Sequence, residues 1–174
     1  MLTNTPGPSG VNTGNRVRSL NTSPGHPNRV EPGKRPRVTL TPTLVLKDGL
    51  PAMAISVAGG DLQDQTTLNV LLNHIDFGME PKDAVTAPRF HMNHHQDSFN
   101  PNPDRSSAFV GEGQLRVNAG LSDEVIKSLV DRGHRLGITP GPIASPVMIV
   151  IDPKTGQMHA AGDPRAGRHA GAEE

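Results

Sequence analysis

The stretch 51–75 constrains the fold most, because a strand pattern passes directly into a helix pattern there through two adjacent glycines. Residues 51–58 (PAMAISVA) mix small and apolar side chains, which is typical of a strand covered on both faces. Gly59 and Gly60 allow a tight corner, because glycine tolerates positive φ angles and close backbone contacts. A helix that ends before Gly78 is then predicted by apolar residues at helical spacing, namely Leu68, Val70, Leu71 and Ile75.

A β-hairpin is predicted just before this corner. Residues 39–47 (TLTPTLVLK) have high strand propensity, and Asp48-Gly49 is a typical two-residue hairpin turn before the strand 51–58. Pro42 lacks the N–H group that a central strand needs. We therefore expect the strand 39–47 to lie at the edge of the sheet or to contain a bulge.

Two helices and a second hairpin are predicted after the first helix. Pro81 occupies a position that needs no donor and starts a short helix. The clearest helix pattern is 121–132, where Ser122 is a suitable N-cap and four apolar residues form the expected buried face, Val125, Ile126, Leu129 and Val130. Strand patterns at 147–151 and 157–161 form the last hairpin. The order of elements predicts an α+β fold, with helices packed on an antiparallel sheet.

The remaining segments are predicted to be irregular. Gly (19) and Pro (17) make up about a fifth of the 174 residues, and only 33% of the chain is hydrophobic, so we expect short elements and many turns. Residues 1–32 are expected to be loop-rich or disordered, and 91–113 to form a long surface loop. The folded domain is assigned to 33–168, with an irregular end beginning near Gly162 and a tail at 169–174.

Charge and cysteine content exclude several classes of function. The formal net charge is zero, so no electrostatic field favours nucleic acid or an anionic membrane as a partner. The absence of cysteine excludes disulfides, thiolate catalysis and cysteine-based metal sites. The segment MLTNTPGPSG has neither the charged nor the apolar region of a signal peptide. We therefore expect a cytoplasmic location for the chain as encoded, while a longer parent enzyme could be periplasmic or secreted.

Two alternative sites are disfavoured. A metal centre would use three histidines at helical spacing, His91, His94 and His95. Polar residues and proline surround them, which favours a solvated loop, so we predict no metal and no cofactor. A hydrolytic triad would use Asp131, His134 and Ser145. Ser145 lacks the glycine-flanked turn of a nucleophile elbow, and the other two residues sit at a helix end.

Five short motifs occur in the same order as in the C-terminal, small-subunit part of the gamma-glutamyltranspeptidase family, which the chain resembles over 24–168. They are GKRP at 33–36, GG at 59–60, IDFGM at 75–79, APRF at 87–90 and GDPR at 162–165. The resemblance implies part of the αββα sandwich of an N-terminal-nucleophile hydrolase. It also implies the activity of the family, in which a Thr hydroxyl attacks a small-molecule γ-glutamyl amide, the α-amine of that Thr acts as base, and the acyl group passes to water or an amine.

The resemblance also suggests roles for residues within the motifs. Gly59 and Gly60 match the family's oxyanion-hole pair, although the same glycines would equally suit a tight turn without catalytic function. Asp163 and Arg165 match a C-terminal motif in which we expect a structural ion pair. Arg89 matches the Arg of the APRF motif and is also expected to be structural.

The chain departs from the family pattern at the donor site and at the nucleophile. Val38 and Thr39 occupy the positions of paired serines that hold the donor carboxylate, and only Thr39 keeps a hydroxyl group. Ser19 replaces an Asp that binds the donor amine, and Arg16 replaces a polar amide. Since an unpaired buried ammonium group costs about 1–3 kcal/mol, these changes predict a donor other than an ordinary γ-glutamyl group. The family's Thr-Thr-His-like processing motif is absent from the sequence, so we expect the chain alone to be inactive.

Two hypotheses remain open at the level of sequence. In the first, the chain is one portion of an amidohydrolase or acyltransferase, and a separate large-subunit portion supplies the Thr. In the second, the chain is a truncated, non-catalytic remnant that acts, if at all, as a binding or assembly domain. In either case, strand edges and an apolar sheet face that lack their usual cover would favour self-association.

Overall fold

The computed structural model describes residues 21–35, 37–109 and 111–171, which fall into two units. The smaller unit combines residues up to Thr39 with Gln96–Phe109, and the larger unit combines Leu40–His95 with residues from 111 onward. The larger unit holds all seven strands and the three α-helices of the described residues. Among these residues no helix is long and apolar enough to span a membrane.

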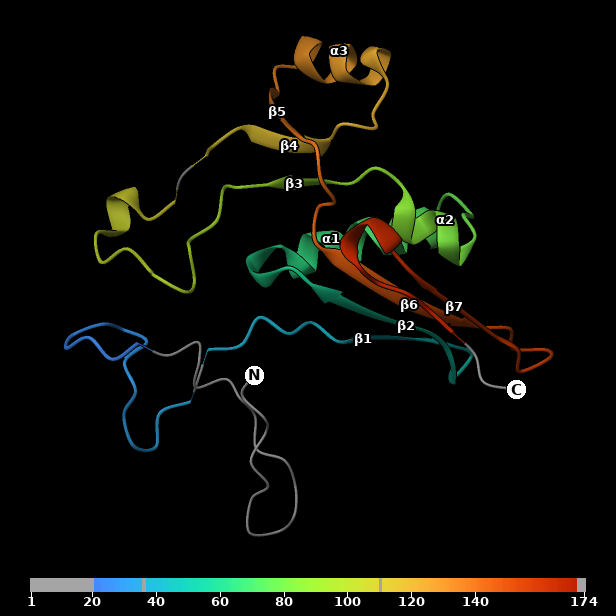
Figure 1. Ribbon diagram of the computed structural model, residues 1–174, viewed down its shortest axis with the longest axis horizontal. Coiled ribbons are helices and arrows are strands. Elements are labelled where there is room, and N and C mark those ends of the chain that lie inside the picture. Colours follow the sequence, from blue (N-terminus) through green and yellow to red (C-terminus); the bar gives the residue numbers. More distant parts are fainter. Residues whose placement is uncertain (1–20, 36, 110, 172–174) are drawn as a thin grey trace. The chain divides into compact units, whose positions relative to one another are not determined.

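A four-stranded antiparallel sheet with the order β1-β2-β6-β7 forms the centre of the larger unit. Its strands are β1 (Thr43–Lys47), β2 (Leu50–Ala58), β6 (Ser145–Ile151) and β7 (Met158–Gly162). Helices α1 (Gln63–Ile75) and α2 (Pro81–Thr86) lie on the same side of this sheet, as Figure 1 shows. The predicted α+β class, both hairpins and the short helix at Pro81 are therefore confirmed.

The hydrophobic core lies between the helices and one face of this sheet. Alternate residues of β2 (Met53, Ile55 and Val57) point into the core and are at most 5% exposed. They pack with fully buried residues of the helices, including Val70 and Val85. Since the residues between them in β2 are exposed, the strand is covered on one face only, and the prediction of cover on both faces is wrong for this chain by itself.

The first hairpin follows the turn chemistry of its sequence. Asp48 and Gly49 both have positive φ angles, 53° and 79°, as a two-residue hairpin turn requires. The strand β1 begins directly after Pro42, lies at the edge of the sheet, and has an irregular register between Val45 and Leu46. Of the two alternatives, the edge position is confirmed. The irregularity is not at Pro42, and the strand starts four residues later than expected, after this proline.

A second, three-stranded sheet was not predicted. It consists of β3 (Phe90–Met92), β4 (Gln114–Asn118) and β5 (Arg135–Thr139), and α3 (Asp123–Asp131) connects the parallel pair β4 and β5. The long surface loop predicted for 91–113 is therefore wrong at its beginning, where His91 is buried within β3. A strand of three residues is too short to show the alternating pattern on which strand prediction depends.

Helices α1 and α3 bury different residues from those that were predicted. In α1, Val70 is fully buried, but Leu68 and Ile75 are more than half exposed, and Gln63, Thr66 and Thr67 take their place in the core. Ser122 caps α3 as predicted, with its Oγ accepting a hydrogen bond from the Val125 amide. No residue of α3 is buried, and Val125 and Val130 are exposed, so the predicted buried face of this helix is wrong within this chain.

The smaller unit joins two segments that are distant in sequence. Asn28 Nδ2 donates to the carbonyl oxygens of Ser98 and Phe99 at 3.1 and 3.0 Å. The guanidinium group of Arg37 stacks over the Phe99 ring at 3.8 Å and also donates to the Ser98 hydroxyl. A short helical turn at Arg105–Ser107 is capped by the Asp104 carboxylate. These contacts give the segment after His95 more order than a solvated loop would have.

Candidate active site

The Gly59–Gly60 corner lies where β2 leaves the sheet. Ala58, the last residue of β2, pairs with Ser145, and the chain then turns through Gly59 into a short helical turn, η2 (Gly60–Leu62), that leads into α1. The Leu62 amide donates to the Gly59 carbonyl oxygen at 3.1 Å and closes this turn. The Gly60 amide opens the turn, and an amide at that position has no partner within the helix. It is thus the kind of group that can stabilise a developing oxyanion.

Each residue of the corner must be glycine for its own reason. Gly60 has a φ angle of +59°, which residues with a side chain rarely adopt. Gly59 has extended backbone, but a Cβ atom there would lie 2.7 Å from the Ala144 Cβ atom. The corner is therefore a close-packed feature, and its two amides stay next to the beginning of β6.

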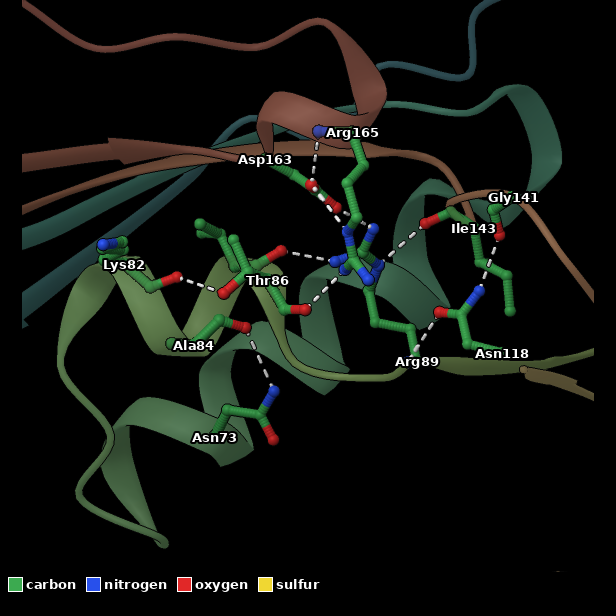
Figure 2. A network of polar contacts seen from close by, with 11 residues as sticks. Asn73, Lys82, Ala84, Thr86, Arg89, Asn118, Gly141, Ile143, Asp163 and Arg165 are labelled. Atoms are coloured by element: carbon green, nitrogen blue, oxygen red, sulfur yellow. Dashed lines mark hydrogen bonds and ion pairs between the residues drawn. The ribbon is translucent and has the colours of Figure 1, made fainter. Parts of the chain in front are cut away.

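A buried ion pair joins Arg89 and Asp163, and Arg89 also contacts the carbonyl group of Ile143, the residue before Ala144. Arg89 Nη2 is 2.6 Å from Asp163 Oδ2, and both side chains are completely inaccessible to solvent. Asp163 Oδ1 also accepts hydrogen bonds from the Arg165 amide and from Arg165 Nε at 3.0 and 3.3 Å (Figure 2). The ion pair expected within the motif at 162–165 is present between Asp163 and Arg165. A structural role was expected for Arg89 as well, but its pairing with Asp163 was not predicted.

All three nitrogens of the Arg89 guanidinium group have partners. Nη2 donates to Asp163, Nη1 donates to the Val85 carbonyl oxygen, and Nε donates to the Ile143 carbonyl oxygen at 2.8 Å. Figure 2 shows the guanidinium group among these three segments. Because the plane of the group fixes the directions of its donors, Arg89 holds α2, the chain before β6 and the chain after β7 in one arrangement.

Asn118 is a further polar residue of this network, and sequence reasoning missed it. Its Oδ1 accepts from the Arg89 amide at 2.9 Å, and its Nδ2 donates to the Gly141 carbonyl oxygen at 2.7 Å. The side chain is 5% exposed and lies at the end of β4. Nothing local to Asn118 indicates this role, because its partners are 29 and 23 residues away in sequence.

The charges around Asp163 determine how its carboxyl group titrates. Burial raises the pKa of this carboxyl group, but the hydrogen bonds and charges of Arg89 and Arg165 outweigh burial and hold that pKa below its usual range. The ionised form is therefore favoured in the folded state. The stability that it contributes is present at neutral pH and is lost only as the pH falls below about 4, through the lowered pKa.

The histidines considered for a metal site do not gather into one. His91 lies in β3 and is 8% exposed, and His94 and His95 follow the strand without forming a helix. In the part of the chain that the structure describes, no group of three His, Cys, Asp or Glu residues could hold a metal ion. The Nδ1 atom of His91 is buried and has no hydrogen-bond partner among these residues. The triad candidate is disfavoured too, since the Asp131 carboxylate pairs with Lys127 at 2.6 Å.

The environment of His91 predicts a pH-dependent stability. Burial lowers the pKa of its imidazole below the ordinary 6.5, the charges of Arg116 and His95 lower it further, and a hydrogen bond with the Met92 backbone only partly opposes them. Between that lowered pKa and 6.5, the unfolded chain binds more protons than the folded chain, so the free energy of unfolding decreases as the pH falls.

We expect the variant His91→Gln to lose less stability than the wild type between about pH 7.5 and pH 5. Urea unfolding followed by far-UV circular dichroism measures this difference, because the chain has no Trp or Tyr for fluorescence. The remaining histidines are common to both proteins, so their effects cancel. Equal losses in the two proteins would show that His91 does not titrate in this range.

The predicted donor-site residues divide between the smaller unit and the part of the chain that is not described. Val38 and Thr39 belong to the smaller unit, in the extended segment before β1, where Val38 is 53% exposed and Thr39 is half-buried. Arg16 and Ser19 lie outside the described residues. The donor-binding roles of all four residues therefore stay predictions.

The face of the four-stranded sheet that points away from α1 and α2 is open and apolar. A groove of about 640 Å³ lies on it, and its lining includes Leu44, Ala54, Val147, Ile149 and Ala160. Leu44 is 63% exposed and Ile149 is 40% exposed. An apolar surface of this kind on a central sheet is typical of an interaction face.

Comparison with known sequences gives one family. Residues 7–172 match the family model described as Gamma-glutamyltranspeptidase. The chain is 31% identical over 170 residues to the glutathione hydrolase proenzyme of Escherichia coli (strain K12), covering 92% of this chain and 26% of that protein. It is 30% identical over 154 residues to the corresponding proenzyme of Bacillus subtilis (strain 168), covering 88% and 23%. The chain thus spans about a quarter of the length of these curated relatives.

Comparison with solved structures gives the same fold. The chain superposes on a cephalosporin acylase from Bacillus halodurans with a TM-score of 0.68 and 28% identity, covering 95% of this chain and 28% of that one. For the T380A mutant of gamma-glutamyltranspeptidase from Helicobacter pylori the TM-score is 0.65 and the identity 27%, with 91% and 83% covered. These similarities confirm the predicted fold, part of an N-terminal-nucleophile hydrolase sandwich.

Proposed function

Because the chain belongs to the gamma-glutamyltranspeptidase family, we propose that it supplies the oxyanion-stabilising corner of an N-terminal-nucleophile amidohydrolase or acyltransferase. The observation that carries this proposal is the Gly59–Gly60 corner, where the positive φ angle of Gly60 and the close approach of Gly59 to the Ala144 Cβ atom both require glycine. Its position at the end of a central strand is suited to present amides to a reacting carbonyl group. The nucleophilic Thr is proposed to come from a portion of the enzyme outside these 174 residues.

The proposed reaction is acyl transfer in two steps. A Thr hydroxyl attacks the carbonyl carbon of an amide, its proton passes to the Thr α-amine, and negative charge develops on the carbonyl oxygen. The Gly59–Gly60 amides stabilise that charge. The amine then leaves with the proton, and the acyl group passes from the Thr oxygen to water or to a second amine. This chain contributes hydrogen-bond donors and rigidity, and it holds neither the nucleophile nor the base.

The proposed donor keeps a carboxylate but lacks the α-amine of a γ-glutamyl group. This proposal rests on Ser19 and Arg16 at the positions where the family pattern has an Asp and a polar amide. Arg pairs well with carboxylates, and Ser cannot neutralise an ammonium group. A glutaryl amide, which is a γ-glutamyl amide without its amine, is the simplest probe with this chemistry.

The proposed partner is the Thr-bearing portion of the same enzyme, and it would cover the open face of the four-stranded sheet. Two features support this. The curated relatives are proenzymes of which this chain matches 23% and 26%, so most of their residues lie outside it. The open face presents apolar side chains from three adjacent strands, β1, β2 and β6. A second sheet packed there would remove this surface from water, which contributes about 25 cal/mol for each Å² buried.

A substitution at Gly60 tests the proposed role of the corner. A β-branched residue does not tolerate a φ angle of +59°, so Gly60→Val displaces the amides that face the oxyanion. In an assembled enzyme we expect kcat to fall by about 10²- to 10³-fold, with KM little changed. The measurement is the release of p-nitroaniline from γ-glutamyl- and glutaryl-p-nitroanilide.

Gly78→Val is the matched control for this substitution. Gly78 has a nearly equal φ angle of +63°, and a Cβ atom added there would meet no other atom within 4 Å. Gly78 lies after the C-terminal end of α1, whereas the corner lies before its N-terminal end. The control therefore introduces the same backbone strain away from the corner, and we expect kcat to stay within about twofold. Equal losses in the two variants would mean that only folding was disturbed, and the oxyanion role would be rejected.

A further inference from the structure

The loop between β5 and β6, residues 140–144, is held by two side chains, one at the end of β4 and one between α2 and β3. Asn118 Nδ2 donates to the Gly141 carbonyl oxygen at 2.7 Å, and Arg89 Nε donates to the Ile143 carbonyl oxygen at 2.8 Å. A hydrogen bond from the Arg89 amide to Asn118 Oδ1 connects the two donors (Figure 2). Ile143 itself is 3% exposed. The loop is therefore fixed at two carbonyl groups by one buried polar network.

The last residue of this loop has an uncommon backbone conformation. Ala144 has a φ angle of +55°, and among the described residues only Asp48, in its hairpin turn, shares a positive φ without being glycine. Such a conformation persists only where the surrounding structure enforces it. At Ala144, the hydrogen bond on the preceding Ile143 carbonyl group and the start of the β6 ladder at Ser145 provide that restraint.

Ala144 packs directly against the glycine corner. A side chain placed on Gly59 would have its Cβ atom 2.7 Å from the Ala144 Cβ atom and 3.6 Å from its Cα atom. Any side chain at Gly59 would therefore collide with Ala144. The position of the loop sets a limit on the position of the corner.

From these contacts we infer that Arg89 is a positioning residue for the Gly59–Gly60 corner, acting through the Ile143 carbonyl group and the Ala144 side chain. The contacts that connect Arg89 to the corner are a property of the fold. Only their expected effect on kcat rests on the proposed function. The Asp163 carboxylate orients the Arg89 guanidinium group, and the guanidinium group holds the loop. The loop then fixes where the corner amides point.

Three variants test the link, one at Arg89 and two at the contact between Gly59 and Ala144. Arg89→Lys keeps a positive charge beside Asp163, but one ammonium group cannot reproduce the planar fork that reaches both Asp163 and Ile143. Gly59→Ala creates the clash with Ala144, and adding Ala144→Gly removes it, because the nearest remaining atom lies at an ordinary contact distance of 3.6 Å. Glycine also suits the positive φ angle at position 144.

The first readout is the amide resonances of residues 59 and 60 in ¹H–¹⁵N NMR spectra of the whole chain, with their hydrogen-exchange rates. We expect Arg89→Lys and Gly59→Ala to shift the residue 60 amide and to speed its exchange, and Gly59→Ala/Ala144→Gly to return both toward the wild-type values. Unshifted amides in Arg89→Lys would overturn the inference. Failure of Ala144→Gly to rescue Gly59→Ala would also overturn it, and this second test remains decisive if Arg89→Lys does not fold.

The second readout is kcat in an assembled enzyme, where a displaced corner is expected to lower kcat by about 10- to 100-fold with KM little changed. A loss of kcat in Gly59→Ala that the double variant restores supports both the link and the oxyanion role. Shifted amides without any loss of kcat would support the positioning link and reject the oxyanion role. The NMR and kinetic results therefore separate a failure of this inference from a failure of the proposed function.

Discussion

Replacing Arg89 with Met is expected to lower the free energy of unfolding by about 3–5 kcal/mol, because it leaves the Asp163 carboxylate buried without its main partner. The two side chains are fully inaccessible, and their nitrogen and oxygen are 2.6 Å apart. Arg165 still contacts Asp163, but its side chain is half exposed and reaches only the other carboxylate oxygen. The substitution also leaves the Ile143 and Val85 carbonyl groups without a donor.

Asp131→Asn is the matched control for this prediction. Asp131 and Lys127 form an ion pair with the same distance of 2.6 Å, but their side chains are 60% and 76% exposed. Water solvates both charges when this pair is broken, so we expect a change of less than about 0.5 kcal/mol. Urea unfolding at neutral pH, followed by circular dichroism, gives both values. Similar losses in the two variants would contradict the importance of burial.

A double substitution separates the pair from the rest of the network. In Arg89→Met/Asp163→Asn the buried charge is absent, while the side-chain amide at position 163 could still cap the turn η4 (Pro164–Ala166) through the Arg165 amide. The double variant should therefore be more stable than the sum of the two single variants predicts, by at least about 1 kcal/mol. Simple additivity would mean that Arg89 stabilises the fold through its carbonyl contacts alone.

The parts of the fold that sequence predicted are those encoded within a few residues. The Asp48-Gly49 turn, the Ser122 cap and the corner at Gly60 each follow from the local backbone preferences of one or two residues. Such preferences do not depend on distant contacts. For the same reason the hairpin β6–β7 and the short helix α2 were predicted close to their observed bounds.

The parts that sequence did not predict depend on distant contacts. The strands β3, β4 and β5 have three to five residues each, and their pairing joins segments separated by a loop and a helix. The ion pair of Arg89 and Asp163 joins residues 74 positions apart, and the motifs predicted a structural role for each residue but not their pairing. The apolar face expected to be buried in α3 is only partly covered, by β5, so that Ile126 and Leu129 are half-buried while Val125 and Val130 stay exposed.

Because the Thr is proposed to lie in a separate portion of the enzyme, we expect a large difference in activity between the chain alone and an assembled form. Alone, the chain is expected to release p-nitroaniline no faster than buffer, because the attacking Thr and its α-amine are absent. A suitable assembled form is a chimera in which this chain replaces the matching 170 residues of the Escherichia coli glutathione hydrolase proenzyme. Enzymes of this kind accelerate their reactions by at least about 10⁶-fold, so even a poorly fitting chimera should exceed the blank.

Two substitutions, one on each side of the four-stranded sheet, test where the two portions of the chimera meet. Ile149→Lys places a charge on the open apolar face and should abolish turnover, since the Thr-bearing portion could no longer pack there. Leu72→Lys on the outer surface of α1 changes a side chain of similar exposure, 37% against 40%, and should leave turnover intact. Equal losses would mean that the open face is not where the two portions meet.

The most direct test compares p-nitroaniline release by the purified 174-residue chain with release by the chimera, using both γ-glutamyl and glutaryl substrates. We predict no release by the chain, release by the chimera, and a preference of the chimera for the glutaryl substrate. Turnover by the chain alone would contradict the proposal that the nucleophile lies outside it. A folded chimera without turnover of either substrate would contradict an enzymatic role and favour a non-catalytic binding or assembly domain.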